Sequence, residues 1–172
     1  SLSYASSGQG SPGHMSFELL QRMTGIELVH VPYKGMSLAL TDVLGGQLQA
    51  AIPTISGVLP HLKSGRLRGI AVTSARRWPA VPELPTFAEA ALPGFESTLW
   101  YAILGPAGLP AAVTAKVNAE VARIVQRPEL RDRFDAQGMD ALVQSPVEFA
   151  AFMKTEFAKW GRVVRESGAK PD

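Results

Sequence analysis

The stretch SSGQGSPGH, residues 6–14, joins two segments of opposite character. Residues 2–5 before it are short and mostly apolar, which is typical of a strand. The Ser11-Pro12 pair predicts a helix start, because serine caps a helix and proline fits its first turn without losing a hydrogen bond. That helix is predicted to end at Gly25. The stretch is therefore a glycine-rich loop between a strand and a helix.

The same alternation of strand and helix continues downstream of this loop. Strands are predicted over residues 26–31, 48–52 and 67–73, and helices over 38–44 and 56–63. Such alternation is typical of an α/β domain with a largely parallel sheet. We therefore predict an α/β fold for the first part of the chain.

Residues 76–96 contain four prolines and mark the predicted boundary between residues 1–95 and 96–172. The second part is predicted to contain two short strands and three helices: strands over 99–104 and 141–143, and helices over 110–125, 128–136 and onward from 146. Two isolated strands make a poor sheet. We therefore expect partner strands upstream of residue 1, and an apolar face in the second part that promotes self-association.

Composition narrows the possible functions. The chain has 172 residues, 46% of them hydrophobic, a formal net charge of +2 and no cysteine. The basic residues are scattered, which disfavours nucleic acid as a partner. The lack of cysteine excludes disulfides, thiol catalysis and zinc–thiolate sites. No apolar run is long enough to span a membrane, and no signal peptide is recognisable, so an exported form is expected to have lost its leader.

The loop itself suggests a pocket for a small oxyanion such as a carboxylate. Free backbone N–H groups and the positive end of the helix dipole favour an anion there. Gly8 and Gly10 allow close approach, and the hydroxyls of Ser6, Ser7 and Ser11 are expected to add donors. The loop contains no acidic residue. The alternative is a capped turn without a ligand, since every helix N-terminus offers such groups.

A dinucleotide site is disfavoured. Gly8, Gly10 and Gly13 match G-x-G-x-x-G, but that fingerprint expects an acid at the end of the next strand. The next strand ends at residues 30–32, His-Val-Pro, and its acid, Glu27, lies near its start. We expect no cofactor.

A serine hydrolase is also disfavoured. The segment QGSPG, residues 9–13, misses the G-x-S-x-G motif at its first position. His14 lies one helical turn beyond Ser11 and is expected to form the polar mouth of the pocket. The other histidines, His30 and His61, have no acid cluster nearby, so no metal site is predicted, and His30 is expected on the solvated face of its strand.

Two further loops are expected at the same edge of the sheet, where ligands of α/β proteins usually bind. Tyr33 follows the second strand, and Thr54 follows the third. Thr54 is a candidate ligand donor or the cap of the following helix. The aromatic residues Trp100 and Trp160 lie in apolar stripes and are expected in the core.

Short motifs along the whole chain carry a resemblance to a known family. They are YASSGQGS (4–11) with His14, VPYKG (31–35), DVLGGQ (42–47), LPHLKSG (59–65), AVTS (71–74), PTFAE (85–89), PAG (106–108) and WGRVV (160–164). In this order they resemble the tripartite tricarboxylate transporter receptors, also called the Bordetella uptake gene (Bug) family.

The resemblance implies a periplasmic binding protein of two α/β lobes that closes on a small carboxylate and serves a membrane transporter. By this comparison residues 1–95 form the second lobe and 96–172 the returning part of the first. It implies ligand contacts for Ser7, Gly8, Gly10, Ser11 and His14, and less directly for Tyr33. Relatives often carry Asp-Asn after the third strand, where this chain has Pro53-Thr54. The lack of an acid there favours a plain mono- or dicarboxylate over an amino acid.

Three functional hypotheses remain open from the sequence. The first is a solute receptor for a transporter, without enzymatic activity. The second is an enzyme acting on a carboxylate or ester, disfavoured because no acid–base pair lies near the loop. The third is a sensory or structural remnant of a receptor that no longer serves transport. Reversible binding without turnover distinguishes the first hypothesis from both others.

Overall fold

The computed structural model describes residues 2–169. The chain divides into two compact units: unit 1 is Ser1–Leu99 with Trp160–Asp172, and unit 2 is Trp100–Lys159. The last helix, α7 (Pro146–Ser167), contributes residues to both units. The prediction that residues 1–95 and 96–172 belong to different lobes of a receptor stays a prediction.

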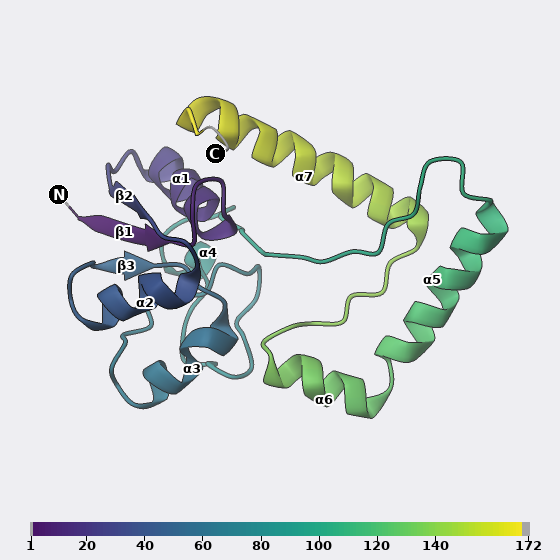
Figure 1. Ribbon diagram of the computed structural model, residues 1–172, viewed down its shortest axis with the longest axis horizontal. Helices are drawn as coiled ribbons and strands as arrows, with labels where there is room; N and C mark the ends of the chain where they lie inside the picture. Colours follow the sequence, from purple (N-terminus) through teal and green to yellow (C-terminus); the bar gives the residue numbers. More distant parts are fainter. Residues whose placement is uncertain (1, 170–172) are drawn as a thin grey trace. The chain divides into compact units, whose positions relative to one another are not determined.

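Unit 1 is built on a three-stranded parallel sheet of order β2-β1-β3 (Figure 1). The strands are β1 (Ser3–Ser6), β2 (Val29–Pro32) and β3 (Ala50–Ala51). In the register, Tyr4 of β1 lies opposite His30 of β2 and Ala50 of β3. The α/β prediction with a parallel sheet is confirmed.

The predicted fourth strand over residues 67–73 is wrong. Val72 forms one parallel bridge with Thr86, and Ile70 is 76% exposed. The segment that runs beside Val72 includes Pro85, whose carbonyl accepts the Val72 N–H at 2.9 Å. Proline has no N–H to donate, so the pairing does not extend into a ladder.

One helix covers each face of the sheet: α1 (Pro12–Thr24) packs on β1 from one side, and α2 (Met36–Leu44) packs on β1 and β3 from the other (Figure 1). Unit 1 also contains α3 (Ile55–Lys63) and the short α4 (Phe87–Ala90). Successive residues of a strand point to opposite faces. Tyr4 therefore stacks on Phe17 of α1 with ring centroids 4.1 Å apart, whereas Ala5 packs with Ala39 of α2. Both Tyr4 and Ala5 are fully buried, so β1 is the centre of this α/β/α arrangement.

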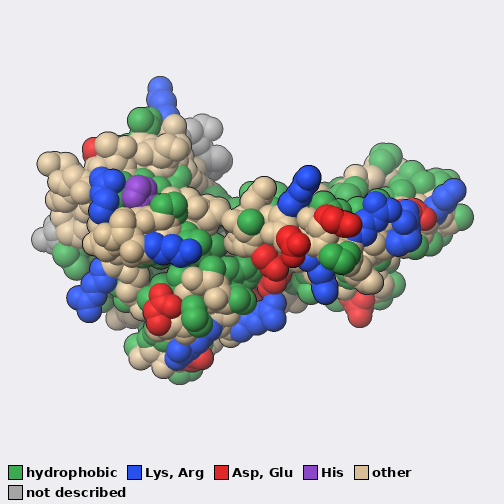
Figure 2. Space-filling model, turned by 90° about the horizontal axis from the view of Figure 1, so that it is seen from below, with side chains coloured by type: hydrophobic (Ala, Val, Ile, Leu, Met, Phe, Trp, Pro, Cys, Tyr) green, Lys and Arg blue, Asp and Glu red, His purple; other side chains and the backbone are tan. Residues whose placement is uncertain are grey.

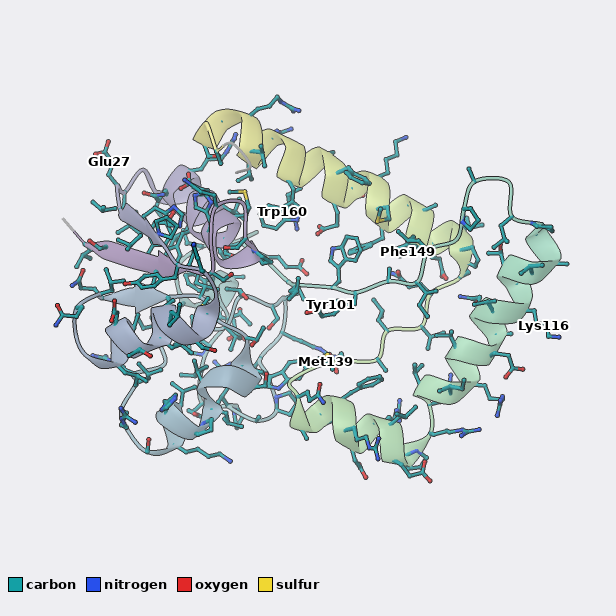
Figure 3. All side chains as sticks on the ribbon, viewed as in Figure 1. Glu27, Tyr101, Lys116, Met139, Phe149 and Trp160 are labelled. Atoms are coloured by element: carbon teal, nitrogen blue, oxygen red, sulfur yellow. The ribbon has the colours of Figure 1, made fainter. Side chains whose placement is uncertain are left out.

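A second apolar cluster joins α1 to the end of α7. Leu19, Phe95 and Val163 are buried together, and Trp160 packs against them (Figure 3). The hydroxyls of Ser16 and Ser97 lie 2.6 Å apart nearby and are both buried. The core position expected for Trp160 is confirmed.

The predicted start and end of α1 are confirmed, and α4 also begins with a side-chain cap. The Ser11 hydroxyl accepts the His14 N–H at the start of α1, and Gly25 ends that helix at a φ of 72°. Thr86 and Glu89 form a reciprocal capping box on α4. These contacts satisfy N–H groups that have no partner within the helix.

Unit 2 consists of α5 (Ala111–Val125), α6 (Pro128–Ala136) and the first part of α7. Trp100 is partly buried in this unit, where it meets Phe149 and Phe152 edge-on and donates its indole N–H to Glu156 at 3.2 Å. The predicted strands over residues 99–104 and 141–143 are wrong. A strand needs a hydrogen-bonded neighbour, and neither segment pairs with another among the described residues.

Large apolar side chains of unit 2 are therefore exposed. They include Tyr101, 80% exposed, and Ile103, Leu104, Leu142, Val147 and Phe157. On the face shown in Figure 2, basic side chains lie among acidic and apolar ones. Within residues 2–169, no helix is both long enough and apolar enough to cross a bilayer.

Candidate functional site

Three loops meet at the carboxyl edge of the sheet in unit 1. A Cβ placed on Gly8 of the β1–α1 loop would lie 3.5 Å from the carbonyl oxygen of Tyr33, which follows β2. A Cβ placed on Gly13 would lie 3.0 Å from the carbonyl oxygen of Ile52, which follows β3. The start of α1 is therefore packed closely against both neighbouring loops, as expected for a binding edge of an α/β sheet.

The backbone N–H groups of the β1–α1 loop fall into two sets. Those of Gly8 and Gly10 are bound by side chains beneath the loop: Gly8 donates to Ser6 Oγ at 3.2 Å, and Gly10 donates to His14 Nδ1 at 3.0 Å. Those of Ser7, Gln9 and Gly13 donate to no acceptor within residues 2–169. Gly13 is buried, so the alternation leaves the amides of Ser7 and Gln9, next to a helix N-terminus, available to an anion.

Serine hydroxyls add donors to this set. Ser11 Oγ accepts the N–H of His14 at 3.4 Å, which leaves its own hydrogen available. Ser7 is half-buried beside it in the loop. The loop, residues 6–14, carries no acidic side chain that would repel an anion.

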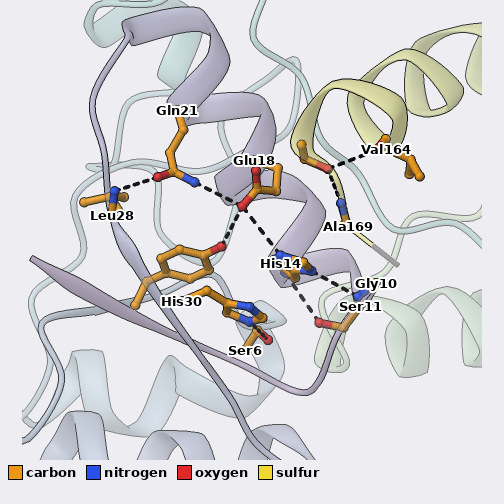
Figure 4. Close-up of polar contacts among 12 residues, drawn as sticks. Ser6, Gly10, Ser11, His14, Glu18, Gln21, Leu28, His30, Val164 and Ala169 are labelled. Carbon is orange, nitrogen blue, oxygen red and sulfur yellow. Dashed lines mark hydrogen bonds and ion pairs between the residues drawn. The ribbon is translucent and has the colours of Figure 1, made fainter. Parts of the chain in front are cut away.

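A polar network lies directly beneath the loop (Figure 4). Its centre is Glu18 of α1, whose Oε1 accepts the hydroxyl of Tyr4 at 3.0 Å and the amide of Gln21 at 3.1 Å. The same oxygen lies 3.5 Å from Nε2 of His14. Tyr4 is fully buried and His14 is 4% exposed. Buried polar groups that are mutually satisfied in this way fix one local conformation.

His30 belongs to this network, so its expected place on a solvated face is wrong. Its ring stacks on that of His14 with centroids 3.9 Å apart and planes 6° from parallel. Its Nε2 lies 2.6 Å from Ser6 Oγ. The reason is the register: His30 lies opposite Tyr4, and both side chains point to the α1 face of the sheet.

Burial keeps both imidazoles neutral at pH 7. Desolvation, with the neighbouring His14, lowers the pKa of His30 from 6.5 to about 4. Desolvation also lowers the pKa of His14, against an opposing effect of Glu18. Desolvation and Glu18 raise the pKa of Tyr4. The network therefore holds two neutral rings stacked face to face below the loop.

Residues 1–169 match the family described as tripartite tricarboxylate transporter family receptor. The chain belongs to this family. It is 34% identical over 169 residues to BugT of Bordetella pertussis, covering 98% of this chain and 52% of BugT. The chain spans about half the length of most of the curated relatives it matches, BugT included.

Two solved structures of receptors share the fold. R. palustris Rpa4515, solved with adipate, has a TM-score of 0.82 and 34% identity, over 99% of this chain and 57% of that one. The periplasmic binding protein BugD has a TM-score of 0.79 and 28% identity, over 99% and 58% of the two chains. The predicted family and the periplasmic binding protein fold are confirmed.

The β1–α1 loop contains most of the predicted site residues. Ser7, Gly8, Gly10 and Ser11 lie in the β1–α1 loop itself. His14, expected at the mouth of the pocket, lies instead behind the loop. A ligand contact for these residues stays a prediction.

The other two predicted residues are placed differently. Tyr33 donates its hydroxyl to Asp42 of α2, 2.5 Å away, and its backbone carbonyl borders the loop at Gly8. Thr54 is the N-cap residue of α3, but its side chain makes no capping bond and is exposed. Its hydroxyl is therefore available for a ligand.

Sequence reasoning missed the supporting residues Tyr4, Glu18 and His30. Ser6, expected to add a donor to the pocket, is instead fully buried, where its hydroxyl contacts His30 and the Gly8 N–H. One local signal was present: His14 and Glu18 are four residues apart and so share one face of the helix. The parts played by Ser6 and His30 depend on strand register, which no local pattern reveals. No cluster suited to a metal ion occurs among the described residues.

Proposed function

We propose that this chain carries the ligand loop of an extracytoplasmic solute receptor that binds a small carboxylate for a tripartite tricarboxylate-type transporter. The observation that supports it most directly is the alternation of the loop amides. Side chains from below hold those of Gly8 and Gly10, while those of Ser7, Gln9 and Gly13 have no acceptor in the described chain. Amides at a helix N-terminus favour a carboxylate.

The residues of the site have different roles in this proposal. Ser7, Gly8, Gly10 and Ser11 form the wall that receives the carboxylate, with amide and hydroxyl donors. His14 supports that wall from behind, and the Tyr33 backbone borders it. Thr54 reaches the distal part of the ligand through its exposed hydroxyl.

The charge of the three loops bears on the class of ligand. Residues 6–14, 33–35 and 52–54 contain no acid, one lysine, Lys34, and one histidine, His14. An ammonium group would find no counter-ion there, and a desolvated unpaired charge is costly. We therefore propose a mono- or dicarboxylate as ligand over an amino acid. The adipate in the related Rpa4515 structure is a dicarboxylate.

The members of this family are solute receptors, and we propose a periplasmic location and no enzymatic activity for this chain. A hydrolase is disfavoured by the surroundings of the serines. Both ring nitrogens of His14 have other partners, since Nδ1 accepts from Gly10 and Nε2 faces Glu18, so neither serves as a base for the Ser11 hydroxyl. Ser6, which does pair with an imidazole, is fully buried and unable to reach a substrate.

Thermal melts of the chain with matched ligand pairs test the proposal. Succinate at a hundredfold over its dissociation constant should stabilise the protein by about 2.7 kcal/mol. Succinamide, which has the same length without charge, should give no shift, and aspartate should bind more weakly than succinate. No shift with succinate, adipate or a monocarboxylate would contradict the receptor proposal and favour the sensory or structural remnant. Tighter binding of aspartate would contradict the ligand class.

We also propose that the exposed apolar side chains of unit 2 promote self-association. Tyr101, Ile103 and Leu142 are each more than 70% exposed, and apolar patches usually mark contact surfaces. Light scattering at increasing concentration should show dimers or larger species that diminish in an Ile103→Ser, Leu142→Ser variant. A monodisperse monomer at high concentration would contradict this proposal.

A further inference from the structure

The hydrogen bond between Gly10 and His14 fixes the tautomer of the histidine. A backbone N–H can only donate, so Nδ1 of His14, 3.0 Å from the Gly10 nitrogen, must accept. Nδ1 therefore carries no hydrogen, and the hydrogen of the neutral ring is on Nε2. That nitrogen faces Oε1 of Glu18 at 3.5 Å.

The surroundings of His14 maintain this one arrangement. Glu18 Oε1 also accepts from Tyr4 and Gln21. Gln21 is itself held, because its Oε1 accepts the N–H of Leu28 at 2.6 Å. The stacked ring of His30 limits rotation of His14 on its other side. Neighbours in α1, β1 and β2 thus orient one ring so that Nδ1 faces the loop.

Protonation of His14 would destroy its contact with the loop. A hydrogen on Nδ1 would point at the N–H of Gly10, so two donors would face each other at hydrogen-bond distance. The cation would also face the ring of His30, 3.9 Å away. The Gly10 amide would then have to turn, and the neighbouring Gln9 amide, which has no acceptor in the described chain, would turn with it.

We propose that His14 is a positioning residue of the receptor: in its neutral tautomer with hydrogen on Nε2 it holds the Gly10 amide inward, and so presents the Ser7 and Gln9 amides to the carboxylate. This proposal rests on the proposed carboxylate site. It predicts that binding requires neutral His14 and weakens in acid for a reason separate from the titration of the ligand.

The charged and titratable groups around His14 favour a neutral ring with its hydrogen on Nε2. Glu18 on α1 attracts a proton to Nε2, Tyr4 on β1 donates to the same carboxylate, and His30 on β2 opposes a second charge. On α7, which also packs on α1, Glu166 pairs with Arg22. Burial further lowers the pKa of His14, which keeps the ring neutral near pH 7.

Two variants separate positioning from a general structural role. His14→Asn places an amide oxygen near the position of Nδ1, can accept from Gly10 and cannot titrate. His14→Ala removes the acceptor. The carboxylate affinity of each variant and of the unaltered chain is measured by calorimetry with succinate from pH 7.5 to 5. The ratio to His14→Asn at each pH cancels the ionisation of the ligand.

The unaltered chain should lose affinity relative to His14→Asn by about tenfold per pH unit below the pKa of His14. His14→Ala should bind weakly at every pH, and His14→Asn should restore most of the affinity at pH 7.5. A ratio that stays constant across this range, or equal affinity of the Ala and Asn variants, would overturn the proposal.

A second measurement decides the proposal without any ligand. Nitrogen-15 spectra of the ligand-free chain should show Nδ1 of His14 without hydrogen, and the Gly10 amide resonance should titrate together with the His14 ring. The Gly10 resonance should not titrate in His14→Asn. Hydrogen on Nδ1 at pH 7, or a Gly10 resonance indifferent to His14, would overturn the positioning role. If the spectra show the expected tautomer and the coupled Gly10 titration but no carboxylate binds, the proposed function is wrong while the described contact between His14 and the loop is correct.

Discussion

Nε2 of His30 lies 2.6 Å from the hydroxyl oxygen of Ser6, and Ser6 is fully buried. In an exposed cleft such a pair would suggest a nucleophile and its base. Here Ser6 Oγ also accepts the Gly8 N–H and lies 3.0 Å from the Gly8 carbonyl oxygen. The pair therefore fastens the β1–α1 loop to β2 from inside, and its removal should affect folding and the loop.

Ser6→Ala should destabilise the chain by roughly 1–3 kcal/mol, because it leaves the Gly8 N–H and His30 Nε2 without their shared partner. Ser7→Ala is the matched control, since the Ser7 side chain makes no such contact, and should change stability by less than about 0.5 kcal/mol. Urea unfolding at pH 7.5 measures both. Equal losses in the two variants would contradict the account of the Ser6–His30 contact.

The free energy of unfolding should fall as the pH is lowered below 6.5, at a higher pH than the one at which the carboxylates titrate. The pKa of His30 is lowered from 6.5 to about 4, so the unfolded chain takes up a proton at a pH where the folded chain does not. The stabilisation is fully present above pH 6.5 and is lost as the pH falls towards 4, a change of roughly 3 kcal/mol.

The window from pH 6.5 to 4.5 limits the change to the two histidines of the network, His30 and His14, whose pKa values are both lowered from 6.5. Glu89 and Glu148, whose pKa values are lowered from 4.5, contribute mainly below this window. Urea unfolding at pH 7, 5.5 and 4.5 measures the slope, which should be shallower in His30→Gln. His61→Gln, which changes a histidine of α3 outside the network, should leave the slope unchanged. A steep slope that survives in His30→Gln would show that another group causes it.

Gly13→Ala should destabilise the chain by about 1–2 kcal/mol, because its Cβ would lie 3.0 Å from the carbonyl oxygen of Ile52. Gly57→Ala is the control: it lies within α3 and its Cβ would come no closer than 3.7 Å to Thr54 Oγ1. That substitution should be neutral or stabilise the helix by up to roughly 1 kcal/mol. Thermal melts compare the two, and a neutral Gly13→Ala would show that the loops are less closely packed.

The buried Ser16–Ser97 pair should respond unequally to loss of either partner. Ser16 Oγ donates its hydrogen to the Pro12 carbonyl at 2.7 Å, so Ser97 must be the donor between the two hydroxyls. Ser16→Ala therefore leaves a buried donor unsatisfied and should cost roughly 1–3 kcal/mol, whereas Ser97→Ala should cost less.

A double-mutant cycle in urea completes this test. The double variant should be less destabilised than the sum of the single variants, because it removes both partners together. Additive losses, or a larger loss for Ser97→Ala, would contradict the assigned direction of the hydrogen bond.

Local features of this fold were predictable from the sequence. The start of α1 at Ser11-Pro12, its end at Gly25 and the capping boxes at Thr86 and Ser145 all act within a few residues, and the structure has them. The glycine-rich loop was predictable for the same reason. Its position at the edge of a parallel sheet followed from the strand–helix alternation around it.

Features that depend on distant partners were not predictable. The apolar runs at residues 67–73 and 99–104 have strand composition, but a strand forms only where a neighbour supplies hydrogen bonds. The support beneath the loop requires Tyr4 and His30 to lie opposite each other, which the register decides. Neither an apolar pattern nor a capping motif contains that information.

The most direct test of the central claim is an amide NMR titration of the chain with adipate. The account predicts that the Ser7 and Gln9 amide resonances shift most, because these amides have no acceptor among residues 2–169 and neither residue is buried. Gly8 and Gly10, held by Ser6 and His14, should shift less. Shifts confined to unit 2, or none in the β1–α1 loop, would contradict a carboxylate site at this edge of the sheet.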